Sequence, residues 1–160
     1  MRRFVSAVSH YIAGLRSGLL PRRAAAPKGG AVPGRFLEYK AKAEQGDAEA
    51  QFNLGFCYDD GRGVAKDYGE AVKWYHKAAG QNFAPAQFNL CYCYANGQGV
   101  VRDKVEAYAW FSMAARADSD AAERRNLLRK ELTPKQFTDA QKRMKELRWQ
   151  IAAKSKPATP

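Results

Sequence analysis

Apolar side chains recur at helical spacing through the middle of the chain, and the same pattern is then used again. Ala50, Leu54, Cys57 and Tyr58 fall on one side of an α-helix predicted over 48–59. The next copy of this apolar stripe begins 36 residues later, at Ala86. The chain therefore predicts one helical unit that is present twice.

The period covers more than the apolar positions. Residues 43–78 and 79–114 are identical at 18 of 36 aligned positions. A fixed period of about 20 to 50 residues is typical of stacked supersecondary units, each of which hides its apolar face against its neighbour. The repeated signature consists of Leu54, Tyr58, Gly61, Gly63, Asp67 and Trp74, then Leu90, Tyr94, Gly97, Gly99, Asp103 and Trp110. The predicted fold class is all-α, a short solenoid of two full helix-hairpin repeats with helical caps.

Each unit is expected to contain two antiparallel helices joined by a glycine turn. The paired glycines at 61 and 63, and again at 97 and 99, mark backbone that needs positive φ. Asp67 and Asp103 are predicted N-caps of the second helices. Glu70 and Glu106 stand three residues later, which favours a reciprocal capping arrangement.

The segments outside the two copies are predicted to cover the ends of the stack. A helix over 35–45 ends at Gly46, whose repeat equivalent is Asn82, and both residues tolerate a left-handed backbone. Helices are also expected over 119–131 and from Thr133-Pro134 to about 152. The predicted divisions are an amphipathic basic segment 1–20, a linker 21–34, an N-terminal capping helix 35–46, two repeats 47–115, C-terminal capping helices 116–153 and a tail 154–160.

The N-terminal segment has three interpretations. Phe4, Val8, Ile12, Leu15 and Leu19 recur at helical spacing among arginines and serines. The segment could be a helix that docks on the protein's own body, a surface or targeting helix, or an irregular export signal. As a hypothesis, it lies in the protein's own groove and is displaced by a partner. No run of 18 apolar residues predicts a membrane span.

Charge is distributed unevenly. The formal net charge is +11, but residues 38–115 carry eight basic and ten acidic side chains. Residues 1–37 carry seven basic and no acidic side chains, and residues 116–160 carry twelve basic and six acidic ones. The slightly acidic repeats therefore argue against a nucleic-acid groove on the repeats themselves, since phosphate contacts require positive charge.

The sequence contains little that predicts catalysis. The two histidines, His10 and His76, have no acid or thiol at workable spacing, and His76 is expected to be a surface helix residue. Three cysteines at 57, 91 and 93 are expected to be buried, reduced and unbridged. No enzyme activity, metal or cofactor is predicted.

The repeated residues resemble the Sel1-like repeat (SLR), a relative of the tetratricopeptide repeat, over about 36–115. The Ala-Trp-Phe at 109–111 followed by Leu132-Thr133-Pro134 is similar to an extension that is common in bacterial members. This resemblance implies a right-handed α/α superhelix that acts as a scaffold or adaptor. A secreted subgroup of the family that pairs cysteines has been linked to penicillin binding. Ala78 and Ala114 end the second helices here without a cysteine, so none of that chemistry is expected.

Partner binding is predicted on the side of the first helices opposite Leu54 and Tyr58, which should be the concave face. The candidate residues are Glu49, Phe52, Asn53, Phe56, Asp59, Phe88, Asn89 and Tyr92. An alternative left open is that these aromatics pack inside the protein. The expected partner is a protein or peptide, the expected state a monomer and the expected compartment the cytoplasm, with export or targeting as the alternative.

A second interpretation uses the basic flanks to bind nucleic acid or an anionic membrane surface. Its residues are Arg124, Arg125, Arg129, Lys130, Lys142, Arg143, Lys145 and Arg148. Such basic residues are also common on a solvated helix face. Binding through the flanks would fall steeply with added salt.

Overall fold

The computed structural model describes residues 33–117 and 119–154, which form seven helices and no strand. The helices are α2 (Pro33–Glu44), α3 (Ala48–Asp60), α4 (Tyr68–Ala79), α5 (Ala84–Asn96), α6 (Lys104–Ala114), α7 (Ser119–Glu131) and α8 (Pro134–Lys154). The predicted N-terminal segment 1–20, most of the predicted linker and nearly all of the predicted tail lie outside the described residues. No helix in 33–117 or 119–154 is long and apolar enough to cross a membrane.

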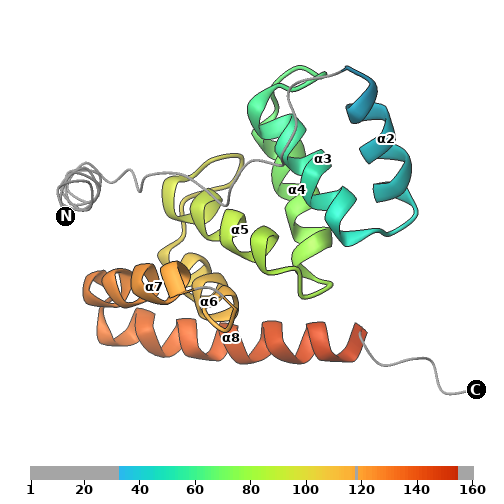
Figure 1. The fold of residues 1–160 in the computed structure, drawn as a ribbon. Helices are drawn as coiled ribbons and strands as arrows, with labels where there is room; N and C mark the ends of the chain where they lie inside the picture. The colour runs from blue at the N-terminus through green and yellow to red at the C-terminus, as the bar shows by residue number, and fades with distance from the viewer. Residues whose placement is uncertain (1–32, 118, 155–160) are drawn as a thin grey trace, which may run out of the picture.

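The helices stack in chain order as hairpins, which confirms the predicted all-α solenoid (Figure 1). Helices α3 and α4 form the first hairpin, and α5 and α6 form the second. Helix α2 packs on α3 at one end, while α7 and α8 both pack on α6 at the other. Helix α8 is the longest, with 21 residues, and it runs past α6 towards the end of α4 (Figure 1).

The helix boundaries follow the predicted signals closely. The observed α7 matches the predicted 119–131, and α3 ends one residue after the predicted 59. Helix α2 begins at Pro33, two residues before the predicted start, and the predicted linker is shorter by that amount. Proline at a first helical position has no amide hydrogen that the helix would leave unpaired, so it suits this start.

The aspartate caps are confirmed, but the reciprocal half of the predicted capping is wrong. Asp67 accepts a hydrogen bond from the Glu70 amide at 3.0 Å, and Asp103 accepts from the Val105 amide at 2.8 Å. The Glu70 carboxylate instead pairs with Lys73 at 2.5 Å, and the Glu106 carboxylate pairs with Arg143. A nearby cation therefore competes successfully for each glutamate.

The glycine turns have the predicted backbone. Gly61, Gly63, Gly97 and Gly99 have φ between 70° and 75°. Asn82, the repeat equivalent of Gly46, also has positive φ, at 63°. The pattern of turn residues was sufficient to predict these conformations because their cause lies within a few residues of the chain.

The core consists of one large cluster and one small one. The large cluster runs from α3 to α8 and includes Tyr75, Leu90 and Trp110. The small cluster joins Ala43 of α2 to Ala50 and Leu54 of α3, with Trp74 partly buried against it. The cysteines at 57, 91 and 93 are buried and free of disulfides, as predicted.

Candidate protein-binding face

The predicted aromatic row lies inside the protein. Phe52, Phe56, Phe88 and Tyr92 are each at most 6% exposed. Phe52 packs against the rings of Tyr75 and Phe83, with centroids 5.9 and 5.5 Å apart. The expectation that this row forms an open contact surface is therefore not met, and the packing alternative describes its surroundings.

The reason is that a middle helix of a stack has neighbours on two sides. Ala50 and Leu54 face α2, where they join the small cluster. Phe52 points the other way and joins the large cluster with α4. Two opposite sides of α3 are therefore both buried, whereas the prediction had only the side of Leu54 and Tyr58 facing inward.

The polar members of the predicted site are mostly buried as well. Asn53, Asp59 and Asn89 are buried, and Asp59 accepts a hydrogen bond from the Tyr75 hydroxyl at 3.2 Å. Glu49, in the first turn of α3, is exposed. Binding of a partner through these eight residues stays a prediction. Of the eight, only Glu49 has a side chain that is exposed to solvent.

Two arginines lie over the buried row. The Arg62 guanidinium carbon is 4.9 Å from the Phe56 ring centroid, and that of Arg124 is 5.2 Å from Phe88 and 5.3 Å from Tyr92. Arg124 also donates a hydrogen bond of 2.5 Å to the Tyr92 hydroxyl. Both arginines are partly exposed. Arg62 covers the α3 part of the row and Arg124, from α7, covers the α5 part, and a cation over an aromatic ring is a stabilising contact. These two arginines are called the arginine strip below.

The sequence analysis did not assign this role to either arginine. Arg62 lies in the glycine turn after α3, where its Nε pairs with Asp60 at 2.6 Å. Arg124 was grouped with the basic flank, because nothing in the sequence places α7 beside α5. A contact between segments 32 residues apart depends on the tertiary arrangement.

Two glutamines were also missed, although the sequence contained a signal for them. Gln51 and Gln87 are buried equivalents in the two repeats. Gln51 Nε2 donates to the Ala43 carbonyl at 3.1 Å, and Gln87 Nε2 donates to the Ala79 carbonyl at 3.4 Å. Each one joins a first helix to the end of the preceding second helix. Their recurrence at the 36-residue period could have identified them as part of the stack.

Several arginines of the basic flank are engaged in contacts with other residues of the chain. Arg129 lies 3.7 Å from the Phe137 ring centroid, and Arg143 pairs with Glu106 and Glu146. Arg125 donates to Asn126 at 2.9 Å. Fewer cations than the sequence suggested are therefore available for a nucleic acid or a membrane. The exposed cations of this set are Lys130, Lys142, Lys145 and Arg148.

His76 is not the surface residue that the sequence predicted. Its ring packs edge-on against Tyr94 and Trp110, and its Nε2 lies 3.0 Å from the Tyr94 hydroxyl. Burial lowers the pKa of His76, and the positive charge of Arg143 lowers it further. The contacts join α4 to both helices of the second repeat, so His76 belongs to the junction between repeats. Within the described residues, no group of three or more His, Cys, Asp or Glu side chains is placed to hold a metal ion.

Comparison with protein families identifies the repeated unit. The family described as Sel1 repeat matches residues 48–83 and 84–119. Two curated relatives share a 37-residue segment with this chain, and both are named DAP3-binding cell death enhancer 1. The rat protein is 51% identical and the mouse protein 49% identical over this segment. The segment is 23% of this chain but only 7% of either relative.

Two solved structures have a similar fold. The protective antigen c5321 of uropathogenic Escherichia coli, which has an SLR fold, matches 83% of this chain with 33% identity and a TM-score of 0.71. A Sel1 repeat protein from Oxalobacter formigenes matches 54% of this chain with 45% identity and a TM-score of 0.53. The matches cover 31% and 36% of those chains, so this chain spans about a third of each.

Proposed function

Because residues 48–119 are two repeats of the Sel1 family, whose members are in general protein–protein interaction scaffolds, we propose that this chain is a scaffold that binds a polypeptide partner. The proposed contact surface is the face of α3, α5 and α7, at the arginine strip formed by Arg62 and Arg124. Phe56, Phe88 and Tyr92 of the predicted row form the floor of this surface. The proposed role is binding alone, without catalysis by this chain.

The arginine strip is the observation that carries this proposal. Both arginines are partly exposed, their guanidinium groups are held over aromatic rings of α3 and α5, and Arg124 links α7 to α5. Arginines held in this way lose little further conformational freedom on binding, which favours association. Arginine is also enriched among the residues that dominate the binding energy of protein interfaces. The names of both curated relatives describe them as DAP3-binding.

The partner can be identified by cross-linking from the strip. A photo-reactive amino acid is placed at position 62 or 124 of the full chain, which is expressed in its native cells. Cross-linked polypeptides are then identified by mass spectrometry. The matched control carries the same probe at Lys142, which is exposed on α8. The proposal expects a polypeptide that is captured from the strip and not from the control.

A titration with that purified polypeptide then tests the surface. The double variant Arg62→Ala/Arg124→Ala should bind at least about tenfold more weakly, as expected for interface arginines. The control double variant Lys142→Ala/Lys145→Ala should bind like the wild type. The opposite result would contradict the proposal and favour the basic flank. Far-ultraviolet circular dichroism verifies that both variants are folded.

A further inference from the structure

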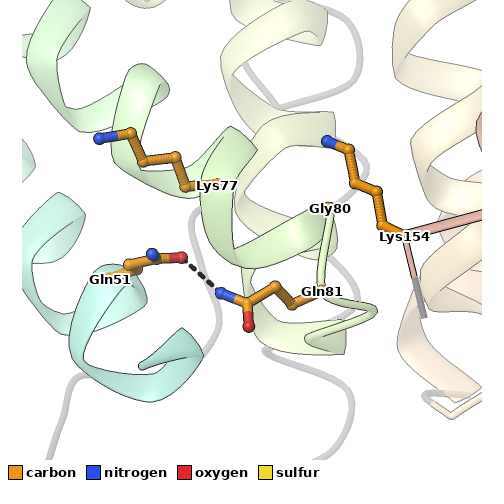
Figure 2. A pocket seen from close by; sticks show the side chains of 5 residues that line it. All are labelled: Gln51, Lys77, Gly80, Gln81 and Lys154. Carbon is orange, nitrogen blue, oxygen red and sulfur yellow. Dashed lines mark hydrogen bonds between the residues drawn. The ribbon is translucent and has the colours of Figure 1, made fainter. Parts of the chain in front are cut away.

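A cavity of about 410 Å³ lies beside the end of α4, and neither arginine of the strip lines it. It is lined by residues from α3, from α4 and the turn after it, and from α8 (Figure 2). These residues are Gln51, Lys77, Gly80, Gln81 and Lys154. The volume falls within the range of protein ligand sites, about 300 to 1,000 Å³.

The charged groups of this cavity are both positive. Lys77 and Lys154 line it together with no acidic side chain. Neither lysine forms an ion pair with another described residue. The Lys77 ammonium lies 3.7 Å from the Trp74 ring centroid, a cation–π contact that limits its movement. Two lysines among the lining residues, with no acidic side chain beside them, favour an anionic ligand.

The polar floor of the cavity is fixed by hydrogen bonds. Gln51 is 5% exposed, and its Oε1 accepts from Gln81 Nε2 at 2.9 Å (Figure 2). Gln51 Nε2 donates to the Ala43 carbonyl, while Gln81 Nε2 also donates to the Gly46 carbonyl at 2.8 Å. A floor held in one geometry binds a ligand with a small ordering cost.

Gly80 lies in contact range of the Lys154 ammonium. Its backbone is right-handed, with φ −66°, so the conformation does not require glycine. A Cβ added there would lie 3.2 Å from the His76 carbonyl oxygen and 3.6 Å from Lys154 Nζ. The last turn of α8 brings this lysine across the molecule to the first repeat (Figure 1).

The second repeat has no such cavity chemistry. Gln87 is retained, but the residues equivalent to Lys77, Gly80 and Gln81 are Met113, Arg116 and Ala117. Since the second repeat forms the same hairpin without them, the hairpin does not require Lys77, Gly80 or Gln81.

We propose that this lysine cavity binds a carboxylate, the acidic side chain of a polypeptide partner. Carboxylate fits better than phosphate because no arginine lines the cavity and the start of α3, which contributes Gln51, is already capped by Asp47. The C-terminal end of α4 also adds partial negative charge, which penalises a dianion more than a monoanion. Only the statement that a polypeptide carries this carboxylate rests on the proposed function.

Nuclear magnetic resonance of the full ¹⁵N-labelled chain tests the lysine cavity directly. The probe is a blocked tripeptide, alanine-glutamate-alanine, and the matched control peptide has glutamine in place of glutamate. The glutamate peptide should shift the side-chain amides of Gln51 and Gln81 and the Gly80 backbone amide. A third titration uses inorganic phosphate.

Variants of the full chain complete the test. Lys77→Met introduces the residue that the second repeat has at this position. Lys77→Met and Lys154→Met should each raise the dissociation constant for the glutamate peptide by about tenfold, as expected for a lost charge-assisted hydrogen bond. Lys142→Met on α8 is the control and should not change binding. Unchanged spectra away from the cavity show that a variant is folded.

Three results would overturn the proposal. They are equal shifts with the glutamine peptide, binding of phosphate in preference to the glutamate peptide, and no shift at the cavity with any probe. The scaffold proposal is tested separately at Arg62 and Arg124, so either proposal can fail while the other holds.

Discussion

Gly55 of α3 lies directly against α4, the second helix of the first hairpin. A Cβ at this position would be 2.8 Å from two ring carbons of Tyr75, whose hydroxyl is bonded to buried Asp59. Gly55→Ala should therefore lower the free energy of unfolding by about 1 to 3 kcal/mol, despite the better helix propensity of alanine. Urea denaturation measures the change. Gly34→Ala is the matched control, because a Cβ on Gly34 meets nothing within 4 Å.

The two repeated tryptophans are equivalent in sequence but not in burial. Trp110 is 3% exposed in the large cluster, whereas Trp74 is partly buried and lies beneath the Lys77 ammonium. Trp110→Ala should lower the free energy of unfolding by about 3 to 5 kcal/mol, as for a fully buried aromatic residue. Trp74→Ala should cost clearly less. The stability losses of the two variants are compared by their denaturant midpoints. Equal losses would contradict the prediction that the difference in burial sets the cost.

His76 makes the junction between the repeats sensitive to acid. Its pKa is lowered in the folded protein by burial and by Arg143, so the unfolded chain binds more protons in acid. The resulting stability is complete above the unfolded pKa of about 6.5 and is lost as the pH falls below it, until the folded pKa is reached. His76→Phe removes this contribution.

Urea midpoints at neutral pH and at mildly acidic pH measure the effect. The wild type should lose more stability between the two conditions than His76→Phe does. Parallel losses in both proteins would show that other groups cause the acid sensitivity. The variant keeps an aromatic ring beside Tyr94 and Trp110, so the packing of the junction is largely retained.

Among the elements, α8 has the reciprocal cap that α4 and α6 lack. The backbone N–H of Gln136 donates to Thr133 Oγ1 at 3.2 Å, and the backbone N–H of Thr133 donates to Gln136 Oε1 at 3.0 Å. Thr133→Ala should cost about 1 kcal/mol of stability, measured by thermal or urea unfolding. Thr138→Ala is the control, since its hydroxyl only bonds back to the Pro134 carbonyl within the helix. A loss as large for the control would argue against the cap.

The elements could be predicted well because their signals are local. Asp67, Asp103 and Thr133 each mark a helix start through contacts with residues two or three positions away. The side-chain partner of Glu106 could not be predicted in the same way. Arg143 lies 37 residues further along the chain, and only the packing of α8 on α6 brings it close.

At the scale of the whole molecule, the buried faces were the hardest feature to predict. The period predicted which helices stack, but not that both stripes of α3 would be covered or that His76 would enter the junction. The lysine cavity is a further case, because Lys77 comes from the first repeat and Lys154 from the last helix. Surfaces made by distant segments are defined by the assembled fold, whereas the repeat signature describes one unit.

The stack should not be equally stable along its length. Helix α2 is held by a small cluster with only Ala43, Ala50 and Leu54 fully buried, whereas α5 and α6 lie within the large cluster. In a solenoid each unit is stabilised mainly by its neighbours, so an end unit with one small contact opens most easily. Native-state hydrogen exchange of the full chain should therefore show faster exchange in the middle of α2 than in the middle of α5 or α6. Leu54→Ala should increase exchange in α2 more than in α6, because it removes the main apolar contact of the small cluster. Equal protection in all three helices would mean that the chain opens as one cooperative unit, without a weaker N-terminal end.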